Sequence, residues 1–174
     1  ERPVTIAVDA SGIKVADRGE WMRLRWRRRR GFIKIHIAVD VRTKQIVAME
    51  VTDEGVGDGR MLRPLVEQAL MHCRVERVLL DGAYDSRENF TFLADSGIEA
   101  AIKVRRNSSG RARGCHPRRQ AVLEQLSDAE SWRRRVGYGL RWMAETAFSV
   151  FKRLFGEHVT ARSLPNMVRE IQLK

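Results

Sequence analysis

The sequence is poor in cysteine and has no long apolar run. Its two cysteines, Cys73 and Cys115, do not form a disulfide framework, which favours a reducing cytoplasm. Cys115 precedes His116, but no second pair with zinc-ligand spacing accompanies them. No apolar stretch approaches the length of a membrane span, and no signal peptide is visible. These absences argue against a disulfide-rich secreted protein, a zinc-binding module and a membrane protein.

Acidic residues are also scarce relative to basic ones. The 174 residues include 33 Lys and Arg but only 22 Asp and Glu, a net charge of +11. This excess favours a polyanionic partner, most simply nucleic acid, and charge alone would also suit a ribosomal or RNA-binding protein. Two basic segments predict non-specific contacts with a nucleic-acid backbone. They are a block at residues 23–30, interleaved with Trp21 and Trp26, and a loop at residues 105–119. A solubilising charge run is the alternative for both.

Hydrophobic periodicity predicts several short strands. Apolar content is 43%, enough for one globular domain with a real core. Residues 32–40 carry isoleucines at alternate positions, which is typical of a half-buried strand, and residues 45–52 follow as its hairpin partner. A turn is expected at Ser11 and Gly12. The other strands are predicted at residues 4–9, 75–80 and 98–104.

Helices are predicted between and after these strands. Asp58 and Ser86 are suited to cap the first two helices, and the longest helix is predicted over residues 131–155. Further helical segments are expected around residues 121–126 and at 164–173. The order of elements gives an α/β domain in which helices flank a mixed five-stranded sheet.

The long predicted helix carries a polar stripe that folding does not require. At 100° per residue, Arg141, Glu145 and Lys152 lie within about 60° of Tyr138, along about 21 Å of helix. The apolar residues predicted to face the core on the other side are Leu140, Met143, Ala144, Ala147, Val150, Phe151, Leu154 and Phe155. One carboxylate between two cations indicates a metal ligand flanked by phosphate contacts. An exposed face with solvated charges is the alternative.

The spacing of this stripe resembles the signature of DDE transposases of bacterial and archaeal insertion sequences. That signature is a Tyr, two residues, an Arg, three residues, a Glu, six residues and a Lys, and every interval matches. Residues 8–12, Val-Asp-Ala-Ser-Gly, resemble the family's first aspartate motif. Residues 81–85, Asp-Gly-Ala-Tyr-Asp, resemble the second, although Ala83 replaces the usual Gly and therefore needs an ordinary backbone angle.

The resemblance implies the ribonuclease H-like fold, with strand order 3-2-1-4-5. The first and fourth strands are then parallel neighbours, so that Asp9 and Asp81 would lie about 5 Å apart at their ends. Two such carboxylates repel each other unless a cation neutralises them. With Glu145 they form the expected set of catalytic, metal-binding residues, which suits two Mg²⁺ (or Mn²⁺) ions.

Other residues of the three motifs are expected to contact DNA. Arg141 and Lys152 suit phosphates on either side of the cut, and Tyr138 could stack on or hydrogen-bond the terminal nucleotide. Three more acids compete weakly for the metal site: Asp40, Asp58 and Asp85. Asp58 is more simply a helix cap, and Asp85 a turn residue.

We therefore expect residues 1–174 to be a single DDE catalytic domain, acting on double-stranded DNA in the cytoplasm of a prokaryote, near the nucleoid. The resemblance implies metal-dependent endonuclease cleavage at transposon ends, strand transfer to target DNA, and a homodimer assembled on DNA. The N-terminal DNA-binding region of such transposases is expected to be absent. The alternatives are an inactive or repurposed DNA-binding protein, and a ribonuclease H-like nuclease that cuts without joining.

Overall fold

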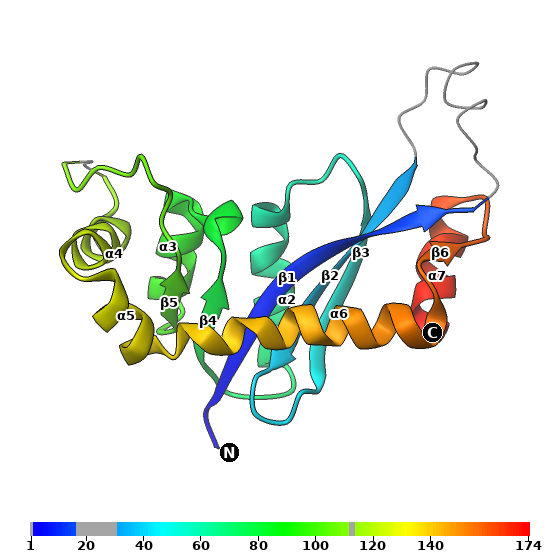
Figure 1. The fold of residues 1–174 in the computed structure, drawn as a ribbon, viewed down its shortest axis with the longest axis horizontal. Coiled ribbons are helices and arrows are strands. Elements are labelled where there is room, and N and C mark those ends of the chain that lie inside the picture. The colour runs from blue at the N-terminus through cyan, green and yellow to red at the C-terminus, as the bar shows by residue number, and fades with distance from the viewer. Residues whose placement is uncertain (1, 17–30, 112–113) are drawn as a thin grey trace.

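A mixed sheet forms the centre of the molecule (Figure 1). The structure is a computed structural model that describes residues 2–16, 31–111 and 114–174. The basic block at residues 23–30, with Trp21 and Trp26, lies outside the described residues. The strands are β1 (Val4–Val15), β2 (Phe32–Asp40), β3 (Ile46–Asp53), β4 (Val75–Leu80), β5 (Glu99–Ile102) and β6 (His158–Val159).

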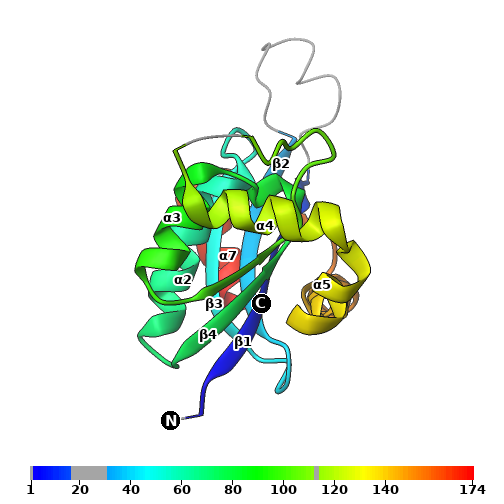
Figure 2. The same ribbon diagram turned by 90° about the vertical axis from the view of Figure 1, so that its left-hand side faces the viewer.

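Helices cover both faces of this sheet (Figure 2). The α-helices are α2 (Leu62–Leu70), α3 (Arg87–Asp95), α4 (His116–Ser127), α5 (Ala129–Val136), α6 (Trp142–Phe155) and α7 (Leu164–Leu173). Short 3₁₀ turns are η1 (Asp58–Met61), η2 (Gly82–Tyr84) and η3 (Tyr138–Arg141). No helix among the described residues is both long and apolar enough to cross a membrane.

The predicted strand order is confirmed. The sheet runs β3-β2-β1-β4-β5, with β6 added beside the far end of β1. β1, β2 and β3 are antiparallel neighbours, whereas β4 is parallel to β1 and β5 is parallel to β4. The hairpin predicted within residues 32–52 forms with Ile35 opposite Val51. The α/β, ribonuclease H-like fold class predicted from the sequence is therefore correct.

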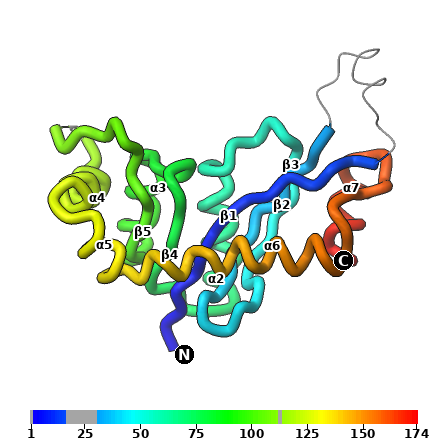
Figure 3. The backbone as a smooth tube through the Cα atoms, in the orientation of Figure 1, coloured from blue at the N-terminus to red at the C-terminus, as the bar shows by residue number. Residues whose placement is uncertain are grey.

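Alternation along β1 divides its side chains between two cores. Ile6 and Val8 join the core beneath α2 and α3, whereas Ala7 and Ile13 join the core beneath α5, α6 and α7. Odd-numbered residues of β1 therefore face α6, which crosses the strand in Figure 3. This alternation decides which helix Asp9 faces.

The turn predicted at Ser11 and Gly12 is wrong, because β1 continues to Val15. Ser11 pairs with Ile35 and Gly12 with Lys34 across the β1–β2 ladder. Hydrogen bonding to a long neighbouring strand outweighs the local turn preference of these two residues. Asp9 consequently lies within β1 rather than at its end.

The single helix predicted over residues 131–155 is also wrong. Gly137 adopts a left-handed conformation (φ 65°) that ends α5, and η3 and α6 follow it. The predicted core face of α6 is only partly correct: Ala144 is buried, but Val150 and Leu154 are exposed. Phe148, which was not predicted to face the core, is buried. Because Tyr138–Arg141 form a 3₁₀ turn with about 3.0 residues per turn, angles counted at 100° per residue from Tyr138 do not carry through α6.

Two smaller predictions also need correction. α4 begins at His116, inside the predicted loop at 105–119, with Pro117 in its first turn, where its missing N–H is no loss. Asp58 does not cap α2: its Oδ1 lies 3.0 Å from Lys34 Nζ. Ser86 does cap α3 as predicted, since its hydroxyl accepts the Asn89 amide hydrogen.

Candidate active site

Asp9 and Asp81 lie side by side on two parallel strands. Ala7 on β1 pairs with Leu79 on β4, and each aspartate is the second residue beyond that pair. Ala7 and Leu79 both belong to the core beneath α6, so by alternation Asp9 and Asp81 are directed toward the same face. The predicted pairing of these two carboxylates at neighbouring strands is therefore present in the fold.

Each of these aspartates is oriented by a local backbone amide. Asp9 Oδ1 accepts the Ala10 N–H at 2.9 Å, and Asp81 Oδ1 accepts the Ala83 N–H at 2.8 Å. Lys44 is the one non-glycine residue with positive φ in the described part of the chain, so Ala83 has the ordinary backbone angle expected for it. The pKa of Asp9 is raised, mainly by burial and also by the Asp81 charge. The Ala10 hydrogen bond and a nearby guanidinium act in the opposite direction and lower it.

That guanidinium belongs to Arg141 and bridges Asp9 to Glu145. Arg141 Nη1 lies 3.2 Å from Asp9 Oδ2, and Nη2 lies 2.5 Å from Glu145 Oε1. The side chains of Arg141 and Asp9 are each 21% exposed, whereas that of Glu145 is 57% exposed. Arg141, predicted as a phosphate contact, thus lies between two of the predicted metal ligands, an arrangement that sequence reasoning missed.

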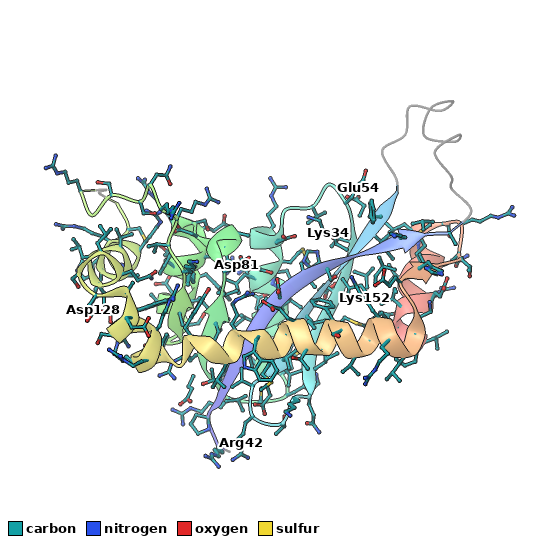
Figure 4. The ribbon with its side chains drawn as sticks, in the orientation of Figure 1. Lys34, Arg42, Glu54, Asp81, Asp128 and Lys152 are labelled. Atoms are coloured by element: carbon teal, nitrogen blue, oxygen red, sulfur yellow. The ribbon has the colours of Figure 1, made fainter. Side chains whose placement is uncertain are left out.

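Two hollows flank the bridged carboxylates. The first, about 560 Å³, is lined by Asp9, Ser11, Glu145 and Lys152, among others. Lys152 lies further along α6 than Glu145. In Figure 4 Asp81 and Lys152 appear on opposite sides of β1. The second hollow, about 630 Å³, runs past Tyr138, Arg141, Trp142 and Glu145.

Tyr138 fixes the start of η3 against the sheet. Its hydroxyl donates to the Leu80 carbonyl at 3.0 Å, one residue before Asp81, and its ring packs on Trp132 with centroids 5.0 Å apart. Burial raises the pKa of Tyr138. The hydroxyl predicted to meet a nucleotide is thus directed to the β4 backbone, while Tyr138 still lines the second hollow.

Asp85 ties the basic segment after β5 to the turn that carries Asp81. Arg118 donates to both carboxylate oxygens of Asp85, from Nε at 2.7 Å and Nη2 at 3.0 Å. The Arg105 amide (2.9 Å) and the Ser108 hydroxyl (3.3 Å) also donate to it. Burial raises the pKa of Asp85, but these hydrogen bonds and the Arg118 charge lower it more. We call this group the Asp85 clasp.

The competing acids have other partners. Asp40 accepts hydrogen bonds from the Arg42 amide and the Thr43 hydroxyl, both at 2.8 Å. It pairs with Ile6 near the start of β1, away from Asp9. Asp58 pairs with Lys34, and Asp85 is held in its clasp. The spacing of Asp85 and Arg118, more than thirty residues apart, offers no local sequence signal for the clasp.

The carboxylates suit a hard divalent cation by their chemistry. Asp9, Asp81 and Glu145 offer the oxygen ligands that Mg²⁺ prefers, and the Arg141 guanidinium shows that a cation is already held between two of them. Among the residues that the structure describes, however, no group of three His, Cys, Asp or Glu is arranged to hold a metal ion. The donor set therefore fits such an ion by its chemistry, while in this structure the Arg141 guanidinium contacts two of its three members.

Comparison with known proteins identifies a family and a similar fold for this chain. A sequence model described as a transposase DDE domain matches residues 1–174, and the chain therefore belongs to this family. Its fold resembles that of a piggyBac transposase solved by cryo-electron microscopy in a synaptic complex with hairpin DNA. The TM-score is 0.51 at 12% sequence identity, and the match covers 99% of this chain and 45% of the other. The chain thus spans less than half of that protein, and the likeness concerns the fold.

Proposed function

We propose that residues 1–174 form the catalytic domain of an insertion-sequence transposase. It would cut DNA at transposon ends with water and join the freed 3′ hydroxyl to target DNA, with two Mg²⁺ or Mn²⁺ ions. Double-stranded DNA would be the partner, bound by a homodimer. The observation that carries the proposal is the placement of Asp9 and Asp81 at matching positions of parallel strands, with Glu145 linked to Asp9 through one guanidinium.

Each carboxylate has a defined part in this proposal. Asp9 and Asp81 are fixed to the sheet and oriented by the Ala10 and Ala83 amides, so they supply a rigid half of the site. Glu145 is more exposed and stands on α6, so it can close on the same point from the helix side. When bound, the cations would activate the attacking oxygen and stabilise the leaving oxygen at phosphorus.

The cationic residues would hold the DNA backbone beside these acids. Lys152 lines the same hollow as Asp9 and Glu145, and its side chain makes no ion pair with any residue in the described ranges. It is therefore suited to take a phosphate oxygen. The Asp85 clasp holds Arg105 and Ser108 near the Asp81 turn, where Arg105 Nε donates to the Gly82 carbonyl. This segment would give the DNA further non-specific contacts.

A strand-transfer assay with pre-cut transposon ends tests the proposal. The wild-type chain should join 3′ ends to target DNA in Mg²⁺, and Asp9→Asn, Asp81→Asn and Glu145→Gln should each abolish joining while the protein stays folded. Asp40→Asn is the matched control, because this aspartate lies on the same sheet but serves a turn, and it should keep the activity.

The outcomes separate the proposal from its alternatives. Cleavage without joining would favour a ribonuclease H-like nuclease, and DNA binding with neither reaction would favour a repurposed, inactive protein. Activity that survives Asp9→Asn or Asp81→Asn would place the chemistry elsewhere and contradict the proposal.

A further inference from the structure

The Arg141 guanidinium lies between Asp9 and Glu145, two of the three proposed metal ligands. It contacts Asp9 and Glu145 at once, through different nitrogens, and so joins the sheet half of the site to the helix half. Asp9 and Arg141 are both largely shielded from water. The Asp9–Arg141 ion pair is therefore less screened by water than a surface ion pair. Displacing Arg141 from Asp9 consequently has a measurable cost in free energy.

The positions of the other cations show that this bridge is specific. Lys152 and Arg153 line the hollow beside Asp9 and Glu145, yet neither side chain forms an ion pair with these carboxylates within the described residues. General attraction to the acids would involve all three cations. The contact is instead restricted to the residue four positions before Glu145 on the helical run, where the side chains of i and i+4 meet.

We propose that Arg141 is a built-in counter-cation that competes with the divalent metal for Asp9 and Glu145, a proposal that rests on the proposed function. Without metal, the single positive charge of the guanidinium offsets half of the charge of the two carboxylates, and the side chain lies between them. Metal binding displaces Arg141, and the freed guanidinium becomes available to a DNA phosphate. Metal and DNA would then favour each other, because each takes one partner of the same bridge.

Removal of the Arg141 guanidinium should strengthen metal binding. Removal of a residue with a merely structural role should instead weaken metal binding. Arg141→Met, which keeps much of the aliphatic stem, should tighten it. We expect Mn²⁺ to bind about fivefold more tightly to this variant in calorimetry without DNA, the size expected when two partly exposed ion pairs no longer compete.

Lys152→Met is the matched control, since it removes one positive charge from the same hollow without breaking the bridge. It should change Mn²⁺ affinity by much less than Arg141→Met does. Equal tightening in both variants would reduce the effect to net charge and overturn the inference. Unchanged or weaker binding in Arg141→Met would overturn it as well.

A second measurement uses the unaltered protein and does not depend on a variant that folds. Ion pairing to two carboxylates restricts rotation of the guanidinium about its Nε–Cζ bond, which ¹⁵N NMR of arginine side chains detects. Saturating Mg²⁺ should release this rotation for Arg141, and unchanged rotation would refute the displacement. If Asp9→Asn with Asp81→Asn leaves Mn²⁺ binding intact, the proposed function fails. If the double variant loses binding but Arg141 does not respond, only this inference fails.

Discussion

The Asp85 clasp should be one of the most costly polar contacts to break in this chain. The Asp85 side chain is 0% exposed and that of Arg118 is 17% exposed, so the pair is screened far less than a surface ion pair. Removal of one partner from a buried pair costs about 3–5 kcal/mol, because the other charge is left without compensation. Arg118→Met leaves the buried carboxylate without a counter-charge, with only the Arg105 amide and the Ser108 hydroxyl still donating to it, and should cost about 4 kcal/mol of the free energy of unfolding. Asp85→Asn leaves a guanidinium that can still reach water, so it should cost nearer to about 3 kcal/mol.

Urea unfolding of both variants and of the double variant measures these costs. Since the two side chains share two hydrogen bonds, the double variant should be less destabilised than the sum of the singles, by about 1–3 kcal/mol. Glu67→Gln is the control, because its ion pair with Arg63 is exposed on α2, and it should cost less than about 0.5 kcal/mol. Single costs at the control level, or strict additivity, would refute a buried clasp.

The same clasp predicts a pH dependence with a definite sign. The folded pKa of Asp85 is lowered, so its stabilisation is complete above the unfolded pKa of about 3.9 and is lost as pH falls through the folded pKa. The stability difference between wild type and Asp85→Asn should therefore be constant from pH 7 to about pH 5 and shrink below about pH 4. A difference that persists unchanged in strong acid would show that Asp85 is not ionised in the folded state.

Three further predictions concern the segment around α6. Gly137→Ala should lower the free energy of unfolding by about 1 kcal/mol because of the left-handed backbone at this position. Gly139→Ala should cost less, because Gly139 has no such angle and open space around it. Thermal unfolding compares the two variants, and equal costs would contradict the reasoning. Tyr138→Phe should cost about 0.5–1 kcal/mol in urea unfolding, because the Leu80 carbonyl keeps a second donor; a cost above about 2 kcal/mol would mean that more than this hydrogen bond is lost. Lys152→Ala should lower the slope of log DNA affinity against log salt by about one unit. An unchanged slope in a salt titration would show that Lys152 is a solvated surface charge that contacts no phosphate.

Strand order was predictable because hydrophobic alternation and the order of strands and helices can both be read from local stretches of the sequence. The isoleucines at alternate positions of β2 select one face, and the parallel partnership of β1 with β4 follows from the fold that the motifs indicate. The length of β1 was not predictable in this way. Ser11 and Gly12 favour a turn locally, and only pairing with Ile35 and Lys34 on a distant segment holds them extended.

The candidate site shows the same division. Motif spacing selected Asp9, Asp81 and Glu145, and the structure puts the first two at matching strand positions with the third across from Asp9. Helical angles could not predict that Arg141 turns toward Asp9, because that contact joins two segments more than a hundred residues apart. The clasp of Asp85 with Arg118 was missed for the same reason.

The break at Gly137 also changes the electrostatics of the site. In one continuous helix Glu145 would lie near the middle, where the helix dipole has little effect. Because the helical run restarts after Gly137, Glu145 lies in the first turn of α6, close to the positive end of that helix dipole. The negative pole of α5 meets three arginines of its own last turn, residues 133–135. A single left-handed glycine thus gives the carboxylate a positive surrounding that a straight helix would not provide.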